Sequence, residues 1–208
     1  MRKKLTTLKL ALGLTLLCSL LPLARGGASL AFEPVKIAGI DSGAVVRLSE
    51  EKDGRRIFHV GRMVINASPE DVFGVLTDYD RAGKLFTNLK DCKVTSKEDN
   101  VKNVFFSVRG IANIWNFDYA LAVKETFPRL IEWHRISGAF KANEGYWKLE
   151  PMEQGRKTMV TYAKFVDGGL IPQALVNRQL KETIPEIMTN LKRLSEGRSN
   201  QVPSGRTT

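Results

Sequence analysis

Apolar and polar residues alternate repeatedly between residues 56 and 166, and a period of two is typical of β-strands with one buried face. Glycine, proline and short polar turns, such as Glu153-Gln154-Gly155, separate the alternating runs. Closely spaced strands joined by short turns indicate an antiparallel meander. The expected strands are 56–66, 92–96, 103–109, 114–127, 130–137, 146–152 and 158–166.

Helices are expected in three places. The first begins at Ser68, whose side chain can cap a helix, and Pro69-Glu70-Asp71 follows with residues that favour a helix N-terminus. A second short helix is expected at 80–86. The last helix is the longest, and Pro185 inside it predicts a bend near Lys181. Its apolar residues recur with helical spacing at Leu175, Val176, Leu180, Ile184, Ile187, Met188, Leu191 and Leu194.

The order of these elements is one strand, two short helices, about six strands and one long C-terminal helix. It predicts an α+β protein in which a curved antiparallel β-sheet wraps around the long C-terminal α-helix, because this packing buries both apolar faces. A strongly bent sheet and one helix leave space between them, so we expect a cavity there. The domain should span 55–196. A leader or linker, or an extra edge strand, precedes it at 32–54, and a disordered polar tail follows at 197–208.

The first 31 residues have the layout of a secretory signal peptide. Basic residues at 2–4 precede an apolar run at 10–23, and small residues follow at 26–31. The apolar run is shorter than the roughly 20 residues that span a bilayer, which favours cleavage after Ala28 or Ala31 over an uncleaved anchor. We therefore expect an exported protein, periplasmic or extracellular, with a signal peptide at 1–31.

Composition excludes several classes of function. The net charge of +10 falls to +5 once the five basic residues of 1–31 are removed, and the remaining charges alternate in sign. A nucleic-acid-binding protein would have a concentrated basic stripe, so no nucleic-acid partner is expected. Two cysteines and two histidines in unlike contexts argue against a disulfide framework and a metal site, and no cofactor is expected.

Residues on the expected strands and the last helix are candidates for the wall of the cavity. On strand 114–127 the odd positions share the apolar face, which should be the inner one. Arg135 could bind a carbonyl, carboxylate or phosphate of a ligand or form a structural ion pair, and the aromatic residues could equally be ordinary core. The candidates are Trp115, Phe117, Tyr119, Trp133, Arg135, Trp147, Tyr162, Ile184 and Met188.

Four segments carry a family likeness: Ile65-Asn66-Ala67-Ser68-Pro69-Glu70-Asp71-Val72-Phe73, Leu76-Thr77-Asp78-Tyr79, Gly145-Tyr146-Trp147-Lys148-Leu149-Glu150-Pro151 and Thr158-Met159-Val160-Thr161-Tyr162. Together they resemble the START-like (SRPBCC) superfamily in its polyketide cyclase/dehydrase branch. They are also similar to coenzyme Q-binding START-like proteins and to ribosome-association toxins. The resemblance covers roughly 57–194. It implies the helix-grip fold and a hydrophobic ligand held between the sheet and the final helix.

The sequence contains no established catalytic motif, so catalytic residues stay unassigned. His134 and Glu132 share a strand face, either as an acid–base pair or as a solvent-facing polar pair. The segment 168–172, Gly-Gly-Leu-Ile-Pro, is either a mobile gate or a plain turn.

The first functional hypothesis is an exported, non-catalytic binding or carrier protein for a lipid, quinone or polyketide-like molecule, a role that allows transient membrane contact. The alternative is an aromatase/cyclase-like enzyme in which Arg135, Tyr119 or Tyr162 polarises a carbonyl of a polyketide-type substrate. An interaction protein similar to the ribosome-association toxins would need a cytoplasmic location, against which the signal peptide argues. The identity of the ligand and the oligomeric state stay open.

Overall fold

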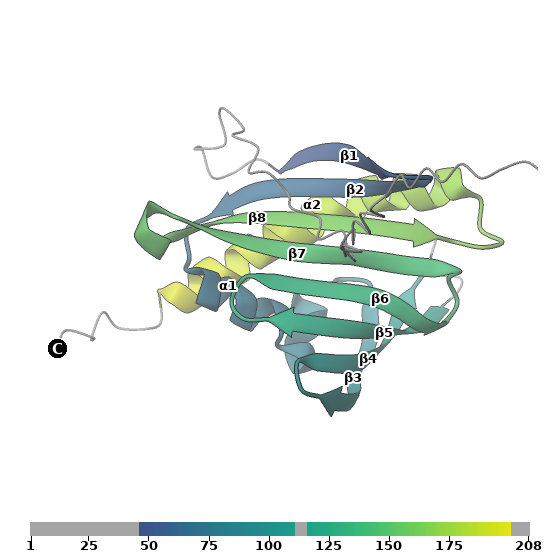
Figure 1. Cartoon of the computed structure of the whole chain (residues 1–208), viewed down its shortest axis with the longest axis horizontal. Helices are drawn as coiled ribbons and strands as arrows, with labels where there is room; N and C mark the ends of the chain where they lie inside the picture. Colours follow the sequence, from purple (N-terminus) through teal and green to yellow (C-terminus); the bar gives the residue numbers. More distant parts are fainter. Residues whose placement is uncertain (1–45, 111–115, 201–208) are drawn as a thin grey trace, which may run out of the picture. The chain divides into compact units, whose positions relative to one another are not determined.

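The computed structural model describes residues 46–110 and 116–200. Most of them belong to one antiparallel sheet of eight strands in the order β1-β2-β8-β7-β6-β5-β4-β3 (Figure 1). The predicted antiparallel sheet is confirmed, and each predicted strand is present. The predicted signal peptide lies outside the described residues, as does the tail beyond residue 200. The strands are β1 (Arg47–Asp53), β2 (Arg56–Ile65), β3 (Leu89–Glu98), β4 (Val101–Arg109), β5 (Asn116–Thr126), β6 (Leu130–Gly138), β7 (Ala142–Met152) and β8 (Lys157–Asp167).

Strand β1 lies in the segment 32–54, for which the sequence left open a linker or an edge strand. It pairs with β2 from Arg47 opposite Arg62 to Asp53 opposite Arg56, so the described part of this segment is an edge strand. Its sequence, RLSEEKD, is mostly charged and exposed. An edge strand on the surface needs no apolar face, which is why hydrophobic periodicity does not reveal it.

Two short helices follow β2, as predicted. Helix α1 (Pro69–Leu76) begins after Ser68, whose hydroxyl oxygen accepts a hydrogen bond from Asp71 N at 3.1 Å. The second is a 3-10 helix, η1 (Tyr79–Lys84), which Asp78 caps. A third short helix, η3 (Glu153–Gly155), forms the turn between β7 and β8. No helix in the described ranges is both long enough and apolar enough to cross a membrane.

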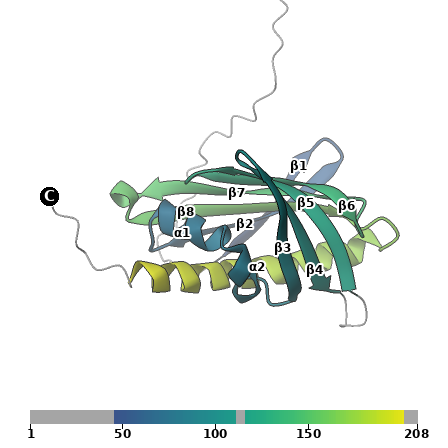
Figure 2. The same cartoon turned by 90° about the horizontal axis from the view of Figure 1, so that it is seen from below.

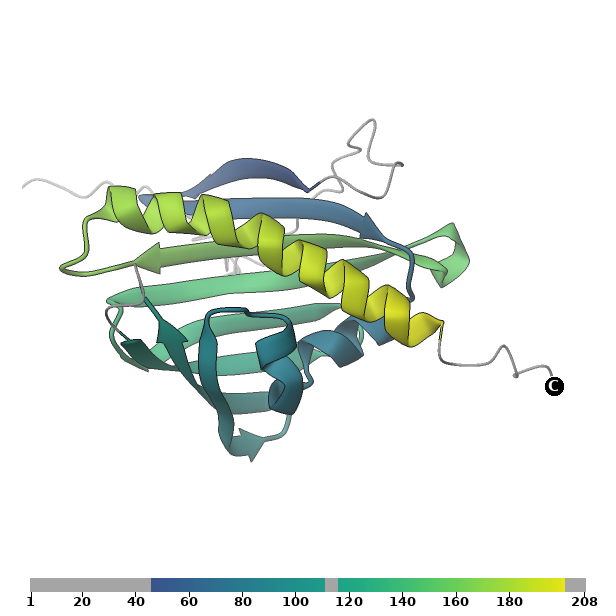
Figure 3. The same ribbon diagram turned by 180° about the vertical axis from the view of Figure 1, so that it is seen from behind.

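The last element, α2 (Gln173–Ser199), lies across one face of the sheet, and the sheet curves around it (Figures 2 and 3). This is the predicted helix-grip arrangement. Helix and sheet approach closely at Gly61 of β2, where an added Cβ would lie 2.4 Å from Met188 Sδ and 2.7 Å from Ile184 Cγ2. The helix continues through Pro185, and the bend expected near Lys181 stays a prediction.

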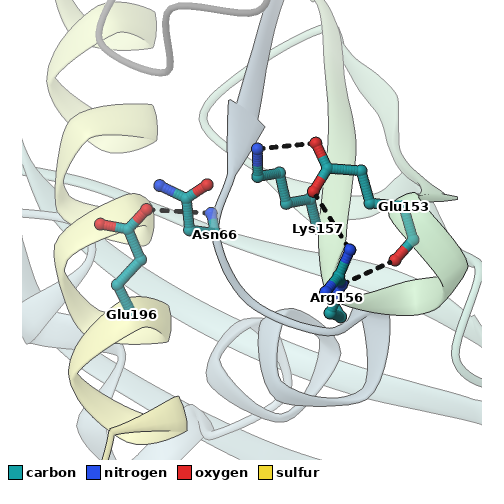
Figure 4. A network of polar contacts seen from close by, with 5 residues as sticks. All are labelled: Asn66, Glu153, Arg156, Lys157 and Glu196. Carbon is teal, nitrogen blue, oxygen red and sulfur yellow. Dashed lines mark hydrogen bonds and ion pairs between the residues drawn. The ribbon is translucent and has the colours of Figure 1, made fainter.

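Helix α2 extends through Ser199, so residues 197–199 are helical and the predicted tail at 197–208 begins too early. Contacts of Glu196 hold the last turns in place. Its Oε1 accepts a hydrogen bond from Asn66 N, just after β2, at 2.9 Å and also pairs with Lys192. Figure 4 shows the bond to Asn66 beside the β7–β8 turn, which the ion pair of Lys157 with Glu153 closes. Tertiary contacts of this kind stabilise a polar helix end that composition alone assigns to a tail.

Candidate functional site: an apolar cavity under the C-terminal helix

A cavity of about 420 Å³ lies between α2 and the face of the sheet that this helix covers. Strands β4 to β8, the end of α1, η1 with the loop after it, and α2 all contribute to its wall. This is the place where the sequence predicts a cavity. Apolar side chains dominate its lining, among them Leu85, Leu121, Val123, Ile131, Leu180 and Ile187.

Aromatic residues from three neighbouring strands form one wall of the cavity. Trp147 of β7 is directly opposite Tyr162 of β8, and the two rings stack with centroids 3.8 Å apart and an interplanar angle of 6°. Trp133 of β6 packs against the same tyrosine ring with a centroid distance of 5.9 Å. All three line the cavity. The structure therefore brings these three predicted residues together into a flat, largely apolar surface.

Gly145 of β7 makes room for the ring of Trp133. A Cβ on this glycine would lie 2.2 Å from Ala163 O and 2.4 Å from Trp133 Cζ2. The indole also donates a hydrogen bond from Trp133 Nε1 to Asn143 Oδ1 of the same strand, β7, at 3.3 Å. Glycine is needed here because the ring lies where a side chain would otherwise be.

Strand β5 turns its odd-numbered residues toward the cavity, as its alternation predicts. Phe117 and Tyr119 both line it. Tyr119 stacks on Phe106 of β4 with a centroid distance of 5.5 Å and an angle of 19°, and Phe140 packs against it at 5.2 Å. The remaining predicted residue of this face, Trp115, lies outside the described residues.

The cavity wall also contains a lysine that the sequence analysis missed. Lys164 follows Tyr162 by two residues on β8, so both side chains lie on the same face of the sheet, and both line the cavity. Among the described residues, none forms a hydrogen bond or ion pair with the Lys164 side chain. Burial lowers the pKa of its ammonium group to about 8. The sequence does contain a hint of this position. Lys164 comes two residues after Tyr162 on a strand, so alternation places both side chains on the same face.

The three tyrosines that line the cavity differ in their hydrogen bonds. Tyr79 donates its hydroxyl proton to Glu125 Oε1 at 2.7 Å, and Lys102 pairs with the same carboxylate at 2.9 Å. The hydroxyls of Tyr119 and Tyr162 have no partner among the described residues. Burial raises the pKa of both phenols above the ordinary value, so they remain protonated donors at neutral pH.

Exposed polar residues mark the side on which the cavity opens. Thr87, Asn88 and Arg109 line it and are exposed, and Asn88 O accepts a hydrogen bond from Arg109 N. Thr87 also donates a hydrogen bond to Glu186 of α2. The loop after η1 is therefore tied both to β4 and to the helix.

Three predicted cavity residues do not line the cavity. Arg135 is opposite cavity-lining Leu121 on β5, but it lies beyond the last residue of β6 that pairs with β7, and its side chain donates to Gly138 O at 2.8 Å. Ile184 and Met188 are fully buried, but they pack on β2 at Gly61. Helical periodicity identifies these two as buried, yet it cannot tell which of two adjacent faces borders an empty space.

The residues considered for catalysis and gating are less closely tied to the cavity. His134 and Glu132 are exposed on β6, which matches a solvent-facing pair, and neither lines the cavity. Within residues 46–110 and 116–200, no group of three or more metal-ligating side chains lies together. In the segment 168–172, Ile171 lines the cavity while Leu170 is fully exposed.

A family model described as polyketide cyclase/dehydrase and lipid transport matches residues 65–192. The chain belongs to this family. The match confirms the resemblance to the polyketide cyclase/dehydrase branch of the START-like superfamily, while the similarity to coenzyme Q-binding proteins stays a prediction. A search of curated proteins found no match.

Solved structures share the fold at low sequence identity. A START superfamily protein from Mycobacterium smegmatis is 17% identical, with a TM-score of 0.58 over 69% of this chain and 97% of that one. A STAR-related lipid transfer protein from Xanthomonas axonopodis is 18% identical, with a TM-score of 0.57 over 72% and 98%. The Zhui aromatase/cyclase of a Streptomyces species is 11% identical, with a TM-score of 0.55 over 78% and 100%. At these identities, the similarity establishes the helix-grip fold.

Proposed function

We propose that this protein is an exported carrier that holds one hydrophobic small molecule, such as a lipid, a quinone or a polyketide-like compound, under α2. The observation that carries this proposal is the apolar, aromatic-walled cavity of about 420 Å³. Pockets of about 300–1,000 Å³ with a few polar groups are typical of small-molecule sites. The family description includes lipid transport, and one similar structure is that of a lipid transfer protein, which supports the proposal.

Filling the cavity should weaken binding without unfolding the protein. Val123 of β5 is 5% exposed and lines the cavity, so Val123→Trp would occupy space that a ligand needs. We expect it to weaken binding of the neutral dye N-phenyl-1-naphthylamine by about tenfold or more, which corresponds to about 1.4 kcal/mol. Dye fluorescence measures the affinity, and circular dichroism confirms that the variant is folded.

Lys124→Trp is the matched control, because Lys124 is the next residue on β5 and is exposed on the opposite face. It should leave the affinity for the dye unchanged. Val108→Trp on β4 tests the same cavity if Val123→Trp does not fold. A folded cavity-filling variant that binds the dye as tightly as the wild type would contradict a ligand site under α2.

Export is the second part of the proposal, and it rests on the signal-peptide pattern of 1–31. Native and denaturing mass spectra of the protein from an exported fraction should show a chain that begins near Ser29 or Phe32 and carries an added apolar mass. An unprocessed chain in the cytosol would contradict export.

Transient membrane contact is part of the same proposal, supported by the fully exposed Leu170 next to cavity-lining Ile171. Sedimentation with lipid vesicles tests it.

The alternative function is an aromatase/cyclase-like enzyme that acts on a polyketide-type substrate. Its support is that Tyr119 and Tyr162 place two phenols in the cavity that have no partner among the described residues, and a hydroxyl donor there can polarise a carbonyl. Arg135 no longer belongs to this hypothesis, because it does not line the cavity. If a Tyr119→Phe, Tyr162→Phe double variant kept full cyclisation activity, these two phenols would not be the catalytic groups.

A further inference from the structure

Lys164 lines a mainly apolar cavity, and no described residue forms an ion pair with its ammonium group. Burial is the one effect that shifts its pKa, to about 8, and no charged side chain contributes. A lysine with this pKa is mostly protonated at neutral pH. An unpaired cation in apolar surroundings costs free energy until an anion neutralises it. Among the described residues, none therefore neutralises the ammonium group of Lys164.

The carboxylates that line the cavity do not neutralise the ammonium group of Lys164. Glu186 accepts a hydrogen bond from Thr87, and Asp78 accepts one from the backbone of Arg81. Neither forms an ion pair with Lys164.

The cross-strand neighbours of Lys164 supply no anion either. On β7 its partner is Gly145, which has no side chain. On β2 its partner is His59, a buried residue whose Nδ1 lies 3.6 Å from Glu50 Oε1. Two residues before Lys164, the hydroxyl of Tyr162 is a further donor without an acceptor in the described part of the chain. Lys164 and Tyr162 are thus two donors on this wall for which residues 46–110 and 116–200 supply no acceptor.

We propose that the molecule held in the cavity has an anionic head, a carboxylate or a phosphate, that pairs with Lys164 while its apolar part packs against Trp133 and Trp147. The inference rests on the proposed carrier function and deepens it, because it names the ligand class as an acidic amphiphile. A charge-assisted hydrogen bond from an ammonium to an oxyanion is about twice as strong as a neutral one, and it gains further in low-dielectric surroundings.

The test compares decanoate, decyl phosphate and decanol as competitors of N-phenyl-1-naphthylamine. The three compounds share one alkyl chain and differ in the head group, so the comparison isolates the charge. The wild-type protein should bind at least one of the two anions about tenfold or more tightly than decanol. The tighter of the two distinguishes a fatty-acid-like carboxylate from a phosphate-bearing lipid as the source of the anionic head.

Three variants separate this role from a structural one. Lys164→Met removes the charge at nearly the same length, so the preference for anions should disappear while decanol binds unchanged. Without ligand, this variant should also melt at a higher temperature than the wild type, because it lacks an unpaired charge in mainly apolar surroundings. Lys164→Arg should keep the preference for anions. Lys148→Met on the other face of β7, where Lys148 pairs with Glu150, is the matched control and should leave all three affinities unchanged.

Each other outcome overturns the inference in a recognisable way. If the wild-type protein binds decanol as tightly as both anions, the ligand needs no anionic head, but the carrier function still stands. If neither the dye nor any competitor binds, the proposed function fails and the inference fails with it. If Lys164→Met is less stable than the wild type, or loses decanol as strongly as decanoate, Lys164 has a structural role.

Discussion

Gly61→Val should lower the free energy of unfolding by about 3 kcal/mol, because the new side chain would occupy space that α2 already fills. An added Cβ would lie 2.7 Å from Cγ2 of Ile184, and this isoleucine is fully buried. The helix would have to move away from β2 to relieve the contact. Valine is common in β-strands, so the predicted loss comes from the contact with α2 and not from the strand propensity of residue 61. Equilibrium unfolding in urea measures the loss.

A compensating change at Ile184 tests the cause. Ile184→Ala removes as many carbons as Gly61→Val adds, and core changes that conserve total volume are tolerated best. Alone, Ile184→Ala should cost about 2–5 kcal/mol through its cavity, but the double variant should be more stable than the two single losses predict. Gly83→Ala, where nothing lies within 4 Å of the added Cβ, controls for loss of a glycine. Strictly additive losses would show that Gly61 and Ile184 do not share one contact.

Trp147→Ala should lower the free energy of unfolding by about 3–5 kcal/mol and weaken dye binding as well. Trp147 is 5% exposed and stacks on Tyr162 with a centroid distance of 3.8 Å. Its loss removes a large buried apolar area together with the ring contact, and it enlarges the cavity on the side where the ligand should pack. Far-UV circular dichroism in urea is the suitable probe, because the variant loses an indole that would report by fluorescence.

Two further variants define the contribution of the Trp147 ring. Trp147→Phe keeps an aromatic ring against Tyr162 and should lose clearly less stability than Trp147→Ala. Phe127→Ala removes an aromatic residue that is 67% exposed, so its effect should be small. A loss below about 1 kcal/mol for Trp147→Ala would contradict its place in a packed wall.

The elements of the fold were largely predictable from local pattern. Alternation identified the strands that have one buried face, and the cap at Ser68 marked the start of α1. For β1 the sequence left a linker and an edge strand open, because a charged edge strand has no apolar period. The last turn of α2 was assigned to the tail because its polar residues are stabilised by a distant partner, Asn66.

The cavity was predictable only in part. Alternation along 114–127 assigned Phe117 and Tyr119 to the inner face, and both line the cavity. It failed for Arg135, which is opposite cavity-lining Leu121 but donates its hydrogen bond to the backbone at Gly138, and alternation does not encode that contact. It also missed Lys164, because a positive charge is not expected on an inner face unless a partner for it is known.

The sequence by itself determined which segments are strands or helices and which face of each is buried, because both follow from backbone periods of 2.0 and 3.6 residues. The tertiary structure alone decided which side chains meet. Register places Trp147 over Tyr162, the close approach at Gly61 directs Ile184 and Met188 to β2, and the curvature of the sheet leaves Lys164 beside an empty space. These contacts join residues far apart in the chain, and their geometry depends on all the packed elements together, so no local pattern encodes them.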